Sequence, residues 1–334
     1  MKELYQVAGI TKQAMWKYRN RQQQVNKTTT EVIRQMEQIR QQHRRMSCRR
    51  MYYVAGKAAL VGRDKFEQIG FANGFKLKPV RNVIRTTWSV RTATYPNLIE
   101  GRKLNDINQV WQSDIFYLRI GPDHYYGFTI EDVYSRELLA LHLSKSLGAE
   151  QLTIAFRKAL SMRKGYSVRG CIFHSDRGTQ YISRVHKQLI KDHQMKISMA
   201  KLPQQNAYVE RLQGILKQEY LWEDELTAGN VDRVLRKIIR RYNLSRPHSS
   251  LNMFTPEAVK NQIKKLRPSK RPCLIIHKGF EKSTGKNNRT HLEKTIWKSG
   301  KNARLFSKEI FSTFPHRNTI NDKLKKTKIK QKNT

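Results

Sequence analysis

The pattern of apolar and polar residues divides the chain into three parts. Residues 105–259 hold the longer apolar and β-branched runs, and the segments on both sides are mainly polar and basic. Strands are predicted over 109–120 and 125–133, because aromatic and β-branched residues predominate there. The turn residues at 121–123 separate these strands, and a third strand is predicted over 137–143. Three strands in succession predict an antiparallel meander.

Helices and strands alternate after this meander. In chain order, the pattern predicts a helix over 148–162, a strand over 170–173, a helix over 180–193, a strand over 196–199, and helices over 205–220 and 229–242. In the last helix, apolar residues follow Val231 at i+3, i+4, i+7, i+8 and i+11, which is the period of an amphipathic helix. Basic residues cover its other face. Strands first, then strands alternating with helices, predict an α/β sheet covered by helices.

The N-terminal residues carry a shorter helical pattern. Residues 2–20 predict two helices with a break at Gly9, and Thr11 is placed to cap the second. This arrangement is typical of a helix-turn-helix, although an ordinary helical hairpin has the same pattern. The second helix carries cations suited to DNA phosphates, namely Lys12, Lys17 and Arg19.

Further helices and the domain boundaries follow from the same pattern. A helix is predicted over 29–46, another ends within 55–59, and Asp64 is expected to cap the next. A short extra strand is predicted within 273–280. The predicted domains are a helix-turn-helix DNA-binding region (1–75), a basic linker (76–104), a catalytic core (105–259) and a basic, partly disordered extension (260–334).

Charge narrows the range of partners. The 334 residues include 66 Lys and Arg against 26 Asp and Glu, which gives a formal net charge of +40. The net charge is +16 over residues 1–104, +6 over 105–259 and +18 over 260–334. Such a charge attracts polyanions, and nucleic acid is the leading partner. An anionic membrane surface is a weaker candidate, because the basic residues are spread along the whole chain.

Cysteine usage and apolar runs indicate a cytoplasmic protein. The three cysteines are far apart and form no disulfide framework, which suits a reducing compartment. The N-terminus lacks the apolar run of a signal peptide. No stretch approaches the roughly 18 apolar residues of a membrane span, so we expect none. The Cys and His spacings match no common zinc site.

Three acids of the predicted core lie in or beside apolar segments, where burial of a charged carboxylate is unfavourable. Asp114 interrupts the first predicted strand, Asp176 follows the apolar strand near 170–173, and Glu210 lies on the helix over 205–220. Each one alone is most simply a helix cap or an ion-pair partner. Together they suit phosphoryl transfer, in which two divalent cations about 3.5–4 Å apart hold the attacking and leaving oxygens. Magnesium prefers carboxylate oxygen and water as ligands.

Four stretches carry a family resemblance. WQSDIFYLRI, HSDRGTQYIS, NAYVERLQGILKQEYL and YNLSRPHSSLNMFTP resemble the DDE integrase core of bacterial insertion-sequence transposases, most closely the second-frame protein of the IS3 family. The resemblance extends over about residues 2–259 and includes LYQVAGITKQAMWKYRNR and GRDKF near the N-terminus. It implies an RNase H-like fold, with a mixed five-stranded sheet and helices on both faces. It also implies that Asp114, Asp176 and Glu210 bind Mg²⁺ or Mn²⁺, two ions in all.

The resemblance has two departures and several implied partners. The interval of 62 positions from Asp114 to Asp176 fits the family, whereas the 34 positions to Glu210 are two fewer than usual. Phe116 occupies a position that is usually threonine. The implied activity is strand cleavage and strand transfer at insertion-sequence ends. The implied partners are duplex DNA with the terminal inverted repeats, target DNA and further copies of the chain, in the nucleoid of a bacterial cytoplasm. Whether an upstream-frame helix-turn-helix protein takes part is left open.

Several neighbouring residues have both a functional and a structural interpretation. Lys217 and Arg211 are expected to meet DNA phosphates, although Lys217 is as readily a solvated lysine. His174 either accompanies the three acids or is a structural histidine. Gly178 is expected in the turn after Asp176, and Gln180 either starts the next helix or contacts DNA. Residues 243–248 are interpreted as a structural latch that folds back on the core. Three nearby acids are expected not to belong to the site: Glu131, Asp132 and Glu219.

Three functional hypotheses remain from the sequence. The first is a DNA transposase, and the intact set of three acids favours it. The second is a non-catalytic DNA-binding regulator or an inactive copy with the same fold. The third is an RNase H-type nuclease, which basic helix-turn-helix flanks make less favourable, since they indicate duplex DNA that is recognised by sequence.

Overall fold

The structure is a computed structural model that describes residues 9, 11–77, 95–120, 123–221, 226–227 and 229–276. The chain forms two compact units, Met1–Val80 and Arg81–Thr334. Several predicted features lie outside the described residues: the helix before Gly9, the turn at 121–122, most of the linker and the chain after 276. None of the described helices is both long enough and apolar enough to cross a membrane.

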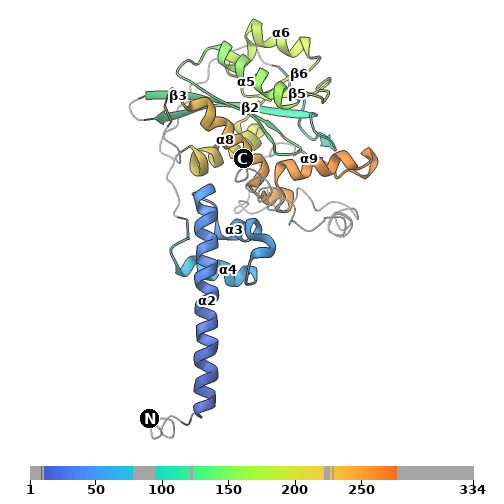
Figure 1. The fold of residues 1–334 in the computed structure, drawn as a ribbon. Helices are drawn as coiled ribbons and strands as arrows, with labels where there is room; N and C mark the ends of the chain where they lie inside the picture. The colour runs from blue at the N-terminus through green and yellow to red at the C-terminus, as the bar shows by residue number, and fades with distance from the viewer. Residues whose placement is uncertain are drawn as a thin grey trace, which may run out of the picture. The chain divides into compact units, whose positions relative to one another are not determined.

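The first unit is helical (Figure 1). Its helices are α2 (Lys12–Gln42), α3 (Cys48–Ala55) and α4 (Arg63–Ala72), with a 3₁₀ turn, η1 (Gly56–Ala58), after α3. They enclose a small core of buried residues: Val32, Met36, Met46, Cys48, Met51, Phe66 and Ile69. All of these follow residue 31, so the first turns of α2 make no contribution to the core, and Trp16 is 63% exposed there.

Two expectations for this unit are corrected. The predicted helices ending near residue 20 and spanning 29–46 are one helix, α2, which runs without a break to Gln42. The intervening sequence has no Gly or Pro to interrupt it. Thr11 does cap this helix, since its Oγ1 accepts a hydrogen bond from Ala14 N at 3.1 Å. Asp64 is not the cap of α4: Gly62 holds that position and Asp64 lies in the first turn.

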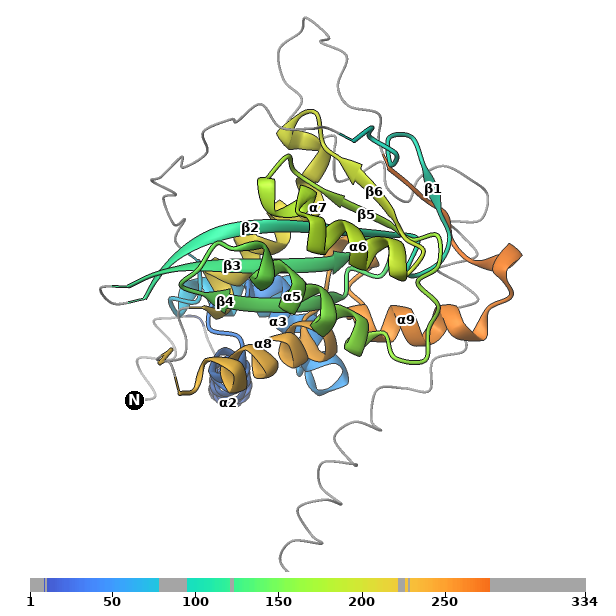
Figure 2. The same ribbon diagram turned by 90° about the horizontal axis from the view of Figure 1, so that it is seen from above.

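A five-stranded mixed sheet forms the centre of the second unit (Figure 2). Its strands are β2 (Val110–Ile120), β3 (Asp123–Asp132), β4 (Leu138–Ser144), β5 (Ile172–Ser175) and β6 (Lys196–Met199). Their order is β4-β3-β2-β5-β6, with β2, β3 and β4 antiparallel and β2, β5 and β6 parallel. The predicted meander is confirmed, and this order and orientation of strands is the expected RNase H-like fold.

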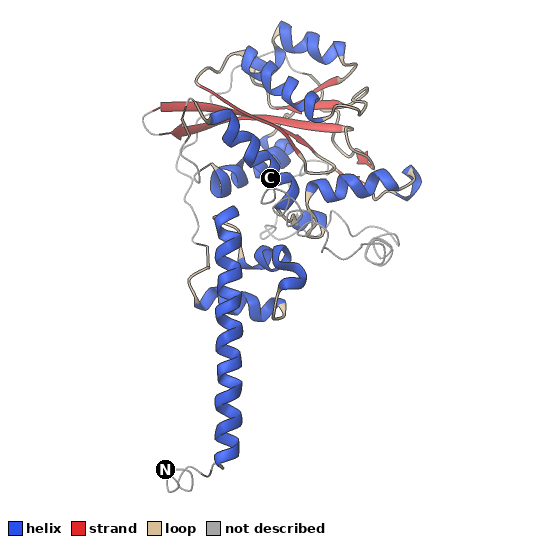
Figure 3. Cartoon of the chain, in the orientation of Figure 1, coloured by secondary structure: helices blue, strands red, loops and turns tan. Residues whose placement is uncertain are grey.

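Helices cover both faces of the sheet (Figure 3). On one face, α5 (Ala149–Met162) and α6 (Arg184–Asp192) pack on Trp111, Phe128 and Phe173. On the other face, α7 (Ala207–Ile215) and α8 (Val231–Ser245) pack on Phe116, Leu141 and Leu143. The predicted stripe of α8 is confirmed, because it buries Val234, Leu235, Ile238 and Tyr242.

Some predicted boundaries move by a few residues. The strand predicted over 170–173 is β5, which extends two residues further, to Ser175. The helix predicted from Gln180 begins only at Arg184, because Ser183 caps it and a 3₁₀ turn, η2 (Thr179–Ile182), precedes it. After α7 the helix continues as a π-helical turn, η4 (Leu216–Tyr220).

Packing extends beyond the predicted core in both directions along the chain. A helix that was not predicted, α9 (Pro256–Lys265), follows the cap Thr255. The short strand β1 (Lys103–Leu104) pairs with β7 (Leu274–Ile275), which lies within the extra strand predicted over 273–280. In and beside these segments, five apolar residues outside 105–259 are buried: Ile99, Leu104, Ile263, Leu274 and Ile276. The end of the predicted linker and the start of the predicted extension are therefore part of the folded unit.

Candidate active site

Asp114 and Asp176 lie at the same level on adjacent parallel strands. The register of β2 and β5 pairs Gln112 with His174, and each aspartate follows two residues later. Because side chains alternate along a strand, both aspartates face the same side of the sheet as Gln112 and His174. Asp114 is on β2, and Asp176 directly follows the end of β5. The predicted strand positions of both acids are confirmed.

Glu210 comes from the helix that covers this face. It lies in the first turn of α7, whose Val209 and Leu212 are buried against the sheet. Glu210 itself is exposed, whereas Asp114 and Asp176 are partly buried. The two-residue shortening before Glu210 falls in the segment that contains the 3₁₀ turn η3 (Pro203–Asn206), so the helix still reaches the sheet.

The three carboxylates interact electrostatically. Burial, together with the charges of Asp176 and Glu210, raises the pKa of Asp114 to about 7. Desolvation also raises the pKa of Asp176, and desolvation followed by the charge of Asp176 raises the pKa of Glu210. None of the three forms an ion pair with a described residue. They therefore form a locally concentrated negative charge, although the chain as a whole is strongly positive.

Such a group fits a divalent cation in its chemistry. Carboxylate oxygens are the ligands that Mg²⁺ and Mn²⁺ prefer, and a cation relieves the repulsion that raises these pKa values. The side chains do not yet enclose an ion: within the described ranges, no three His, Cys, Asp or Glu side chains gather closely enough to hold one. Hydrogen bonds within the protein orient the two aspartates. Asp114 Oδ2 accepts from Gln213 Nε2 at 2.9 Å, and Asp176 Oδ1 accepts from Gly178 N at 3.0 Å.

Amide side chains also join β2 to the segment that carries Glu210. Gln112 Oε1 accepts a hydrogen bond from Val209 N at 3.3 Å. Asn206 Nδ2 donates to the backbone carbonyl of Ser113 at 3.2 Å. Sequence reasoning missed these residues, as it missed Gln213. The available signal was a polar residue two positions before Asp114, on the same face of a strand that is otherwise apolar.

Phe116 and Lys217 lie beside Asp114. The Phe116 ring is buried against Gly127, its partner on β3, where a Cβ would come within 2.2 Å of the ring. Lys217 Nζ lies 5.0 Å from the centroid of this ring, a cation–π geometry. Burial lowers the pKa of Lys217, and the charge of Asp114 opposes this effect. The residue that departs from the family pattern thus supports a lysine near the site.

The residues around Asp176 have clear local roles. His174 is buried on β5, and its Nδ1 lies 2.9 Å from Ser198 Oγ on β6, so the ring is tied to the sheet. At Gly178, a Cβ would come within 3.1 Å of Asp176 Oδ1 and 2.9 Å of Gln180 Oε1. The glycine therefore permits the close approach of its backbone to the carboxylate. Gln180 lies in η2, not at the start of α6.

The predicted DNA-binding residues are all accessible but belong to different units. Arg211 is exposed on α7, directly after Glu210. Lys12, Lys17 and Arg19 are exposed on α2 of the first unit.

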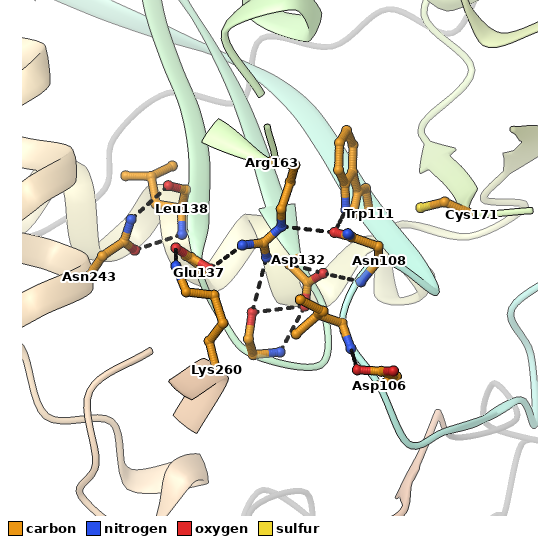
Figure 4. A network of polar contacts seen from close by, with 12 residues as sticks. Asp106, Asn108, Trp111, Asp132, Glu137, Leu138, Arg163, Cys171, Asn243 and Lys260 are labelled. Atoms are coloured by element: carbon orange, nitrogen blue, oxygen red, sulfur yellow. Dashed lines mark hydrogen bonds and ion pairs between the residues drawn. The ribbon is translucent and has the colours of Figure 1, made fainter. Parts of the chain in front are cut away.

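Asp132, which was expected not to belong to the site, and the nearby Glu137 are neutralised by the protein itself (Figure 4). Buried Arg163 pairs with Asp132 at 3.5 Å and with Glu137, and Lys260 Nζ lies 2.7 Å from Glu137 Oε1. Asp132 also accepts hydrogen bonds from the backbone of Asn108 and from Ser135 N and Oγ, at 2.7, 2.8 and 2.9 Å. We refer to Asp132, Glu137, Arg163 and Lys260 as the neutralised cluster.

Glu219 and the segment after α8 are structural in the same way. Arg246 is buried and donates two hydrogen bonds to Glu219, with Nε–Oε2 at 2.8 Å and Nη2–Oε1 at 2.7 Å. Asn243 exchanges two hydrogen bonds with the backbone of Leu138, both at 2.9 Å. These contacts favour the latch interpretation of residues 243–248.

The chain is similar to known protein families, proteins and solved structures. The sequence matches the integrase core domain family over residues 105–202 and again over 191–256. These ranges contain all three carboxylates. In searches of solved structures, the chain is similar to the magnesium-bound catalytic core domain of HTLV-2 integrase, with a TM-score of 0.37 and 20% identity over 46% of this chain and 95% of that one. The catalytic core domain of BIV integrase has a TM-score of 0.36 at 18% identity, over 47% and 97% of the two chains.

Two kinds of relatives come from insertion elements. The IS600 uncharacterized 31 kDa protein of Shigella sonnei is 28% identical over 218 residues, which are 63% of this chain and 78% of that protein. The InsF transposase of insertion sequence IS3A from Escherichia coli K12 is 31% identical over 159 residues, 46% of this chain. The match spans about half, 54%, of that transposase. The chain therefore contains integrase core domain sequence over residues 105–256 and is similar to proteins of IS3-type insertion elements.

Proposed function

We propose that this protein is a DDE transposase that cuts and joins DNA strands at insertion-sequence ends, with Asp114, Asp176 and Glu210 as ligands of two Mg²⁺ or Mn²⁺ ions. The proposal is supported by the placement of three carboxylates on β2, directly after β5 and on α7, whose pKa values are all raised and which have no ion-pair partner among the described residues. The IS3 transposase relatives support the same activity.

The proposed reaction has two steps. Water attacks the phosphodiester at the element's end, and the bond from phosphorus to the 3′ oxygen breaks, which leaves a 3′-hydroxyl on one side and a 5′-phosphate on the other. The freed 3′-hydroxyl then attacks a second phosphodiester, whose own 3′ oxygen leaves. No nucleotide cofactor is needed, because the joining step replaces one phosphodiester by another. Divalent cations, when bound, activate the attacking oxygen and stabilise the charge that develops at phosphorus.

In this proposal, the protein's own residues bind the cations and the DNA strand and orient them for reaction. Asp114 and Asp176 are held by adjacent strands, so their spacing is fixed by the sheet, and Glu210 approaches from the helix above. We infer that Lys217 and Arg211 meet phosphates of the strand that enters the site. A Cβ at Gly214, one turn after Glu210, would meet no atom within 4 Å, so this face of the helix is open to a close approach.

The first unit is proposed to bind the element's terminal inverted repeats. Its exposed cations Lys12, Lys17 and Arg19 lie along one helix. Two copies of the chain would hold the two ends in one complex, with the target DNA as a further partner. An upstream-frame protein is a further candidate partner. We propose domain boundaries at residues 75, 104 and 259. Packed segments on both sides of the core extend the folded unit beyond the last two of these boundaries.

Cleavage of end DNA tests the proposal. A labelled duplex that carries the element's terminal repeats is incubated with the protein and Mn²⁺, and nicked products are resolved on a denaturing gel. We expect cleavage by the wild type and by Asp192→Asn, an exposed position on α6, and none by Asp176→Asn. All three proteins should bind the duplex equally. Equal cleavage by wild type and Asp176→Asn would refute the site, and binding without any cleavage would favour a regulator.

A further inference from the structure

Gln213 joins the helix of Glu210 to the strand of Asp114. It lies on α7, three residues after Glu210, and its side chain is only 7% exposed. Its Nε2 donates to Asp114 Oδ2 at 2.9 Å and lies 3.4 Å from Thr129 Oγ1. One side chain thus contacts β2 and β3 from the helix that covers them.

Thr129 completes this arrangement. It is the register partner of Asp114, and its Oγ1 donates to the Asp114 backbone carbonyl at 2.9 Å. Because that proton is used, the hydroxyl offers its lone pairs to the Gln213 amide. The amide therefore has two acceptors, one on each strand, and is fixed in the orientation that points a donor at the carboxylate.

The chemical type of residue 213 matters as much as its position. Among the described residues, Gln213 is the side chain that donates to the Asp114 carboxylate. A hydrogen bond to a charged group contributes about 1.5–3 kcal/mol. Lysine or arginine here would hold the carboxylate equally well, but its charge would repel a cation. A neutral amide orients the carboxylate and leaves its charge available.

We propose that Gln213 is a positioning residue that fixes the Asp114 carboxylate relative to Glu210 and thereby sets the site's affinity for divalent cations. The inference rests on the proposed function, because it assumes that Asp114 is a cation ligand. Partners that hold a ligand in place typically change metal affinity 10- to 100-fold when they are removed.

The test measures cation binding without DNA. The full-length protein is titrated with Mn²⁺, and the half-saturating concentration is read from the rise in melting temperature and from calorimetry. Gln213→Met keeps the length of the side chain and removes the donor. The matched control is Gln218→Met, which makes the same change at an exposed position of η4, five residues later. Asp114→Asn reports whether binding depends on Asp114 at all.

We expect Gln213→Met to raise the half-saturating Mn²⁺ concentration about 10-fold, while Gln218→Met leaves it unchanged. Gln213→Met should also lower the ion-free melting temperature by several degrees, because the hydrogen bond to Asp114 is lost, so the affinities are compared by calorimetry at a temperature at which both variants are folded. If Gln213→Met is too unstable to titrate, Thr129→Val tests the same role, because it removes the second acceptor of the Gln213 amide. We expect it to raise the half-saturating Mn²⁺ concentration about 3-fold.

Two results overturn different claims. Unchanged Mn²⁺ binding in Gln213→Met, with Asp114-dependent binding in the wild type, refutes the role of Gln213 alone. Binding that Asp114→Asn does not weaken refutes the proposed site and, with it, this inference.

A second inference concerns the outer face of α8. This helix buries one stripe against the sheet and exposes cations at consecutive turns of the opposite face, namely Arg233, Arg236, Lys237 and Arg240. Lys158 pairs with Asp232 at 2.9 Å, whereas Arg233, Arg236 and Arg240 form no ion pair within the described part of the chain. Turns of a helix are about 5.4 Å apart, so these cations form a line of positive charge.

We infer that this face of α8 binds the phosphate backbone of duplex nucleic acid, independently of sequence and of the metal chemistry. Cations that replace counterions on a duplex make binding depend on salt, with a slope of about 0.9 per phosphate contacted. The double variant Arg236→Glu/Arg240→Glu should therefore lower the salt slope by about 2 and weaken binding at least about 10-fold.

The control variant makes the same change of charge on another helix. Lys187→Glu/Lys191→Glu alters two exposed lysines of α6, on the other face of the sheet. Binding of a random-sequence duplex is measured between 50 and 200 mM salt, without divalent ions. We expect the α6 variant to keep the wild-type slope. Equal losses in both variants, or no loss in the α8 variant, would show that α8 is not a specific contact surface.

Discussion

Two groups of acids on one sheet have opposite electrostatic surroundings. The neutralised cluster pairs Asp132 and Glu137 with buried Arg163 and partly buried Lys260. The carboxylates of the candidate site have no such partner among the described residues, and their pKa values are raised. A protein with a net charge of +40 has ample cations to neutralise both groups. Cations pair with the acids of the neutralised cluster, whereas no described cation pairs with the carboxylates of the candidate site.

The difference separates a structural acid from a binding acid. A buried ion pair satisfies its own charges and ties elements together, here β3, α5 and α9. Carboxylates that repel one another store unfavourable energy until a cation binds. Glu131 and Asp132 show the contrast in consecutive residues: Asp132 is fully paired, whereas Glu131 Oε2 has no hydrogen-bond partner.

Glu210 and Glu219 offer the sharpest test, because they lie nine positions apart on one helical segment. We expect Glu210→Gln to lower Mn²⁺-dependent cleavage by at least about 10³-fold, since a cation ligand supplies several kcal/mol in the transition state. Glu219→Gln should instead destabilise the fold by about 3 kcal/mol, because Arg246 is left buried without a full partner. Cleavage assays and urea unfolding on both variants should show lost cleavage for Glu210→Gln and lost stability for Glu219→Gln. If both variants lost cleavage and kept equal stability, the two glutamates would not have different roles.

Arg163 tests the neutralised cluster itself. Arg163→Met removes the charge that Asp132 and Glu137 share and keeps most of the apolar side chain. We expect the free energy of unfolding to fall by about 3–5 kcal/mol, the usual cost of breaking a buried pair. Urea unfolding followed by circular dichroism measures it. A loss below 1 kcal/mol would mean that Lys260 alone neutralises both acids.

Glu131 tests an unneutralised acid away from the proposed ligands. Burial raises its pKa to about 8, and the charge of Arg136 opposes this. The folded protein then keeps the proton to higher pH than the unfolded chain, so stability falls as pH rises from about 4.5 to 8. Glu131→Gln should remove this fall, and its stability relative to wild type should increase between pH 5 and pH 9 by on the order of 2 kcal/mol. Parallel pH curves for the two proteins would show that Glu131 is not the source.

The sequence predicts the sheet better than it predicts the contacts that hold the site. Apolar runs bounded by turn residues place β2 and β4, and a period of 3.6 places α8, all within one to three residues, because these signals are local in the sequence. Long-range pairing leaves no such pattern. The two-residue strands β1 and β7 come from opposite ends of the folded unit's sequence. A strand that contains β7 was predicted, but sequences this short do not identify β1 as its partner.

The site divides in the same way. Asp114, Asp176 and Glu210 could be selected as candidates because acids interrupt apolar runs within one strand, after another and on one helix, and because the residues around them resemble a known family. Gln213 could not be, since a glutamine on a helix is usually a solvated residue. Its role depends on an acceptor 99 positions earlier in the chain. The unbroken α2 was missed for a related reason: a polar helix without Gly or Pro has no local signal for where it continues.

Lys158 and Asp232 supply the smallest effect and separate pairing from burial. Their ion pair, at 2.9 Å, has the geometry of the buried pairs, but its side chains are 38% and 62% exposed. Water already solvates both groups, so Lys158→Met should change the free energy of unfolding by less than about 1 kcal/mol. The loss should shrink further at 1 M salt, where charges are screened over about 3 Å. Urea unfolding beside Arg163→Met makes the comparison direct. If Lys158→Met lowered the free energy of unfolding as much as Arg163→Met does, ion pairing would stabilise this fold whether or not the pair is buried. The absence of an ion-pair partner among the described residues would then not explain the raised pKa values of the site's carboxylates.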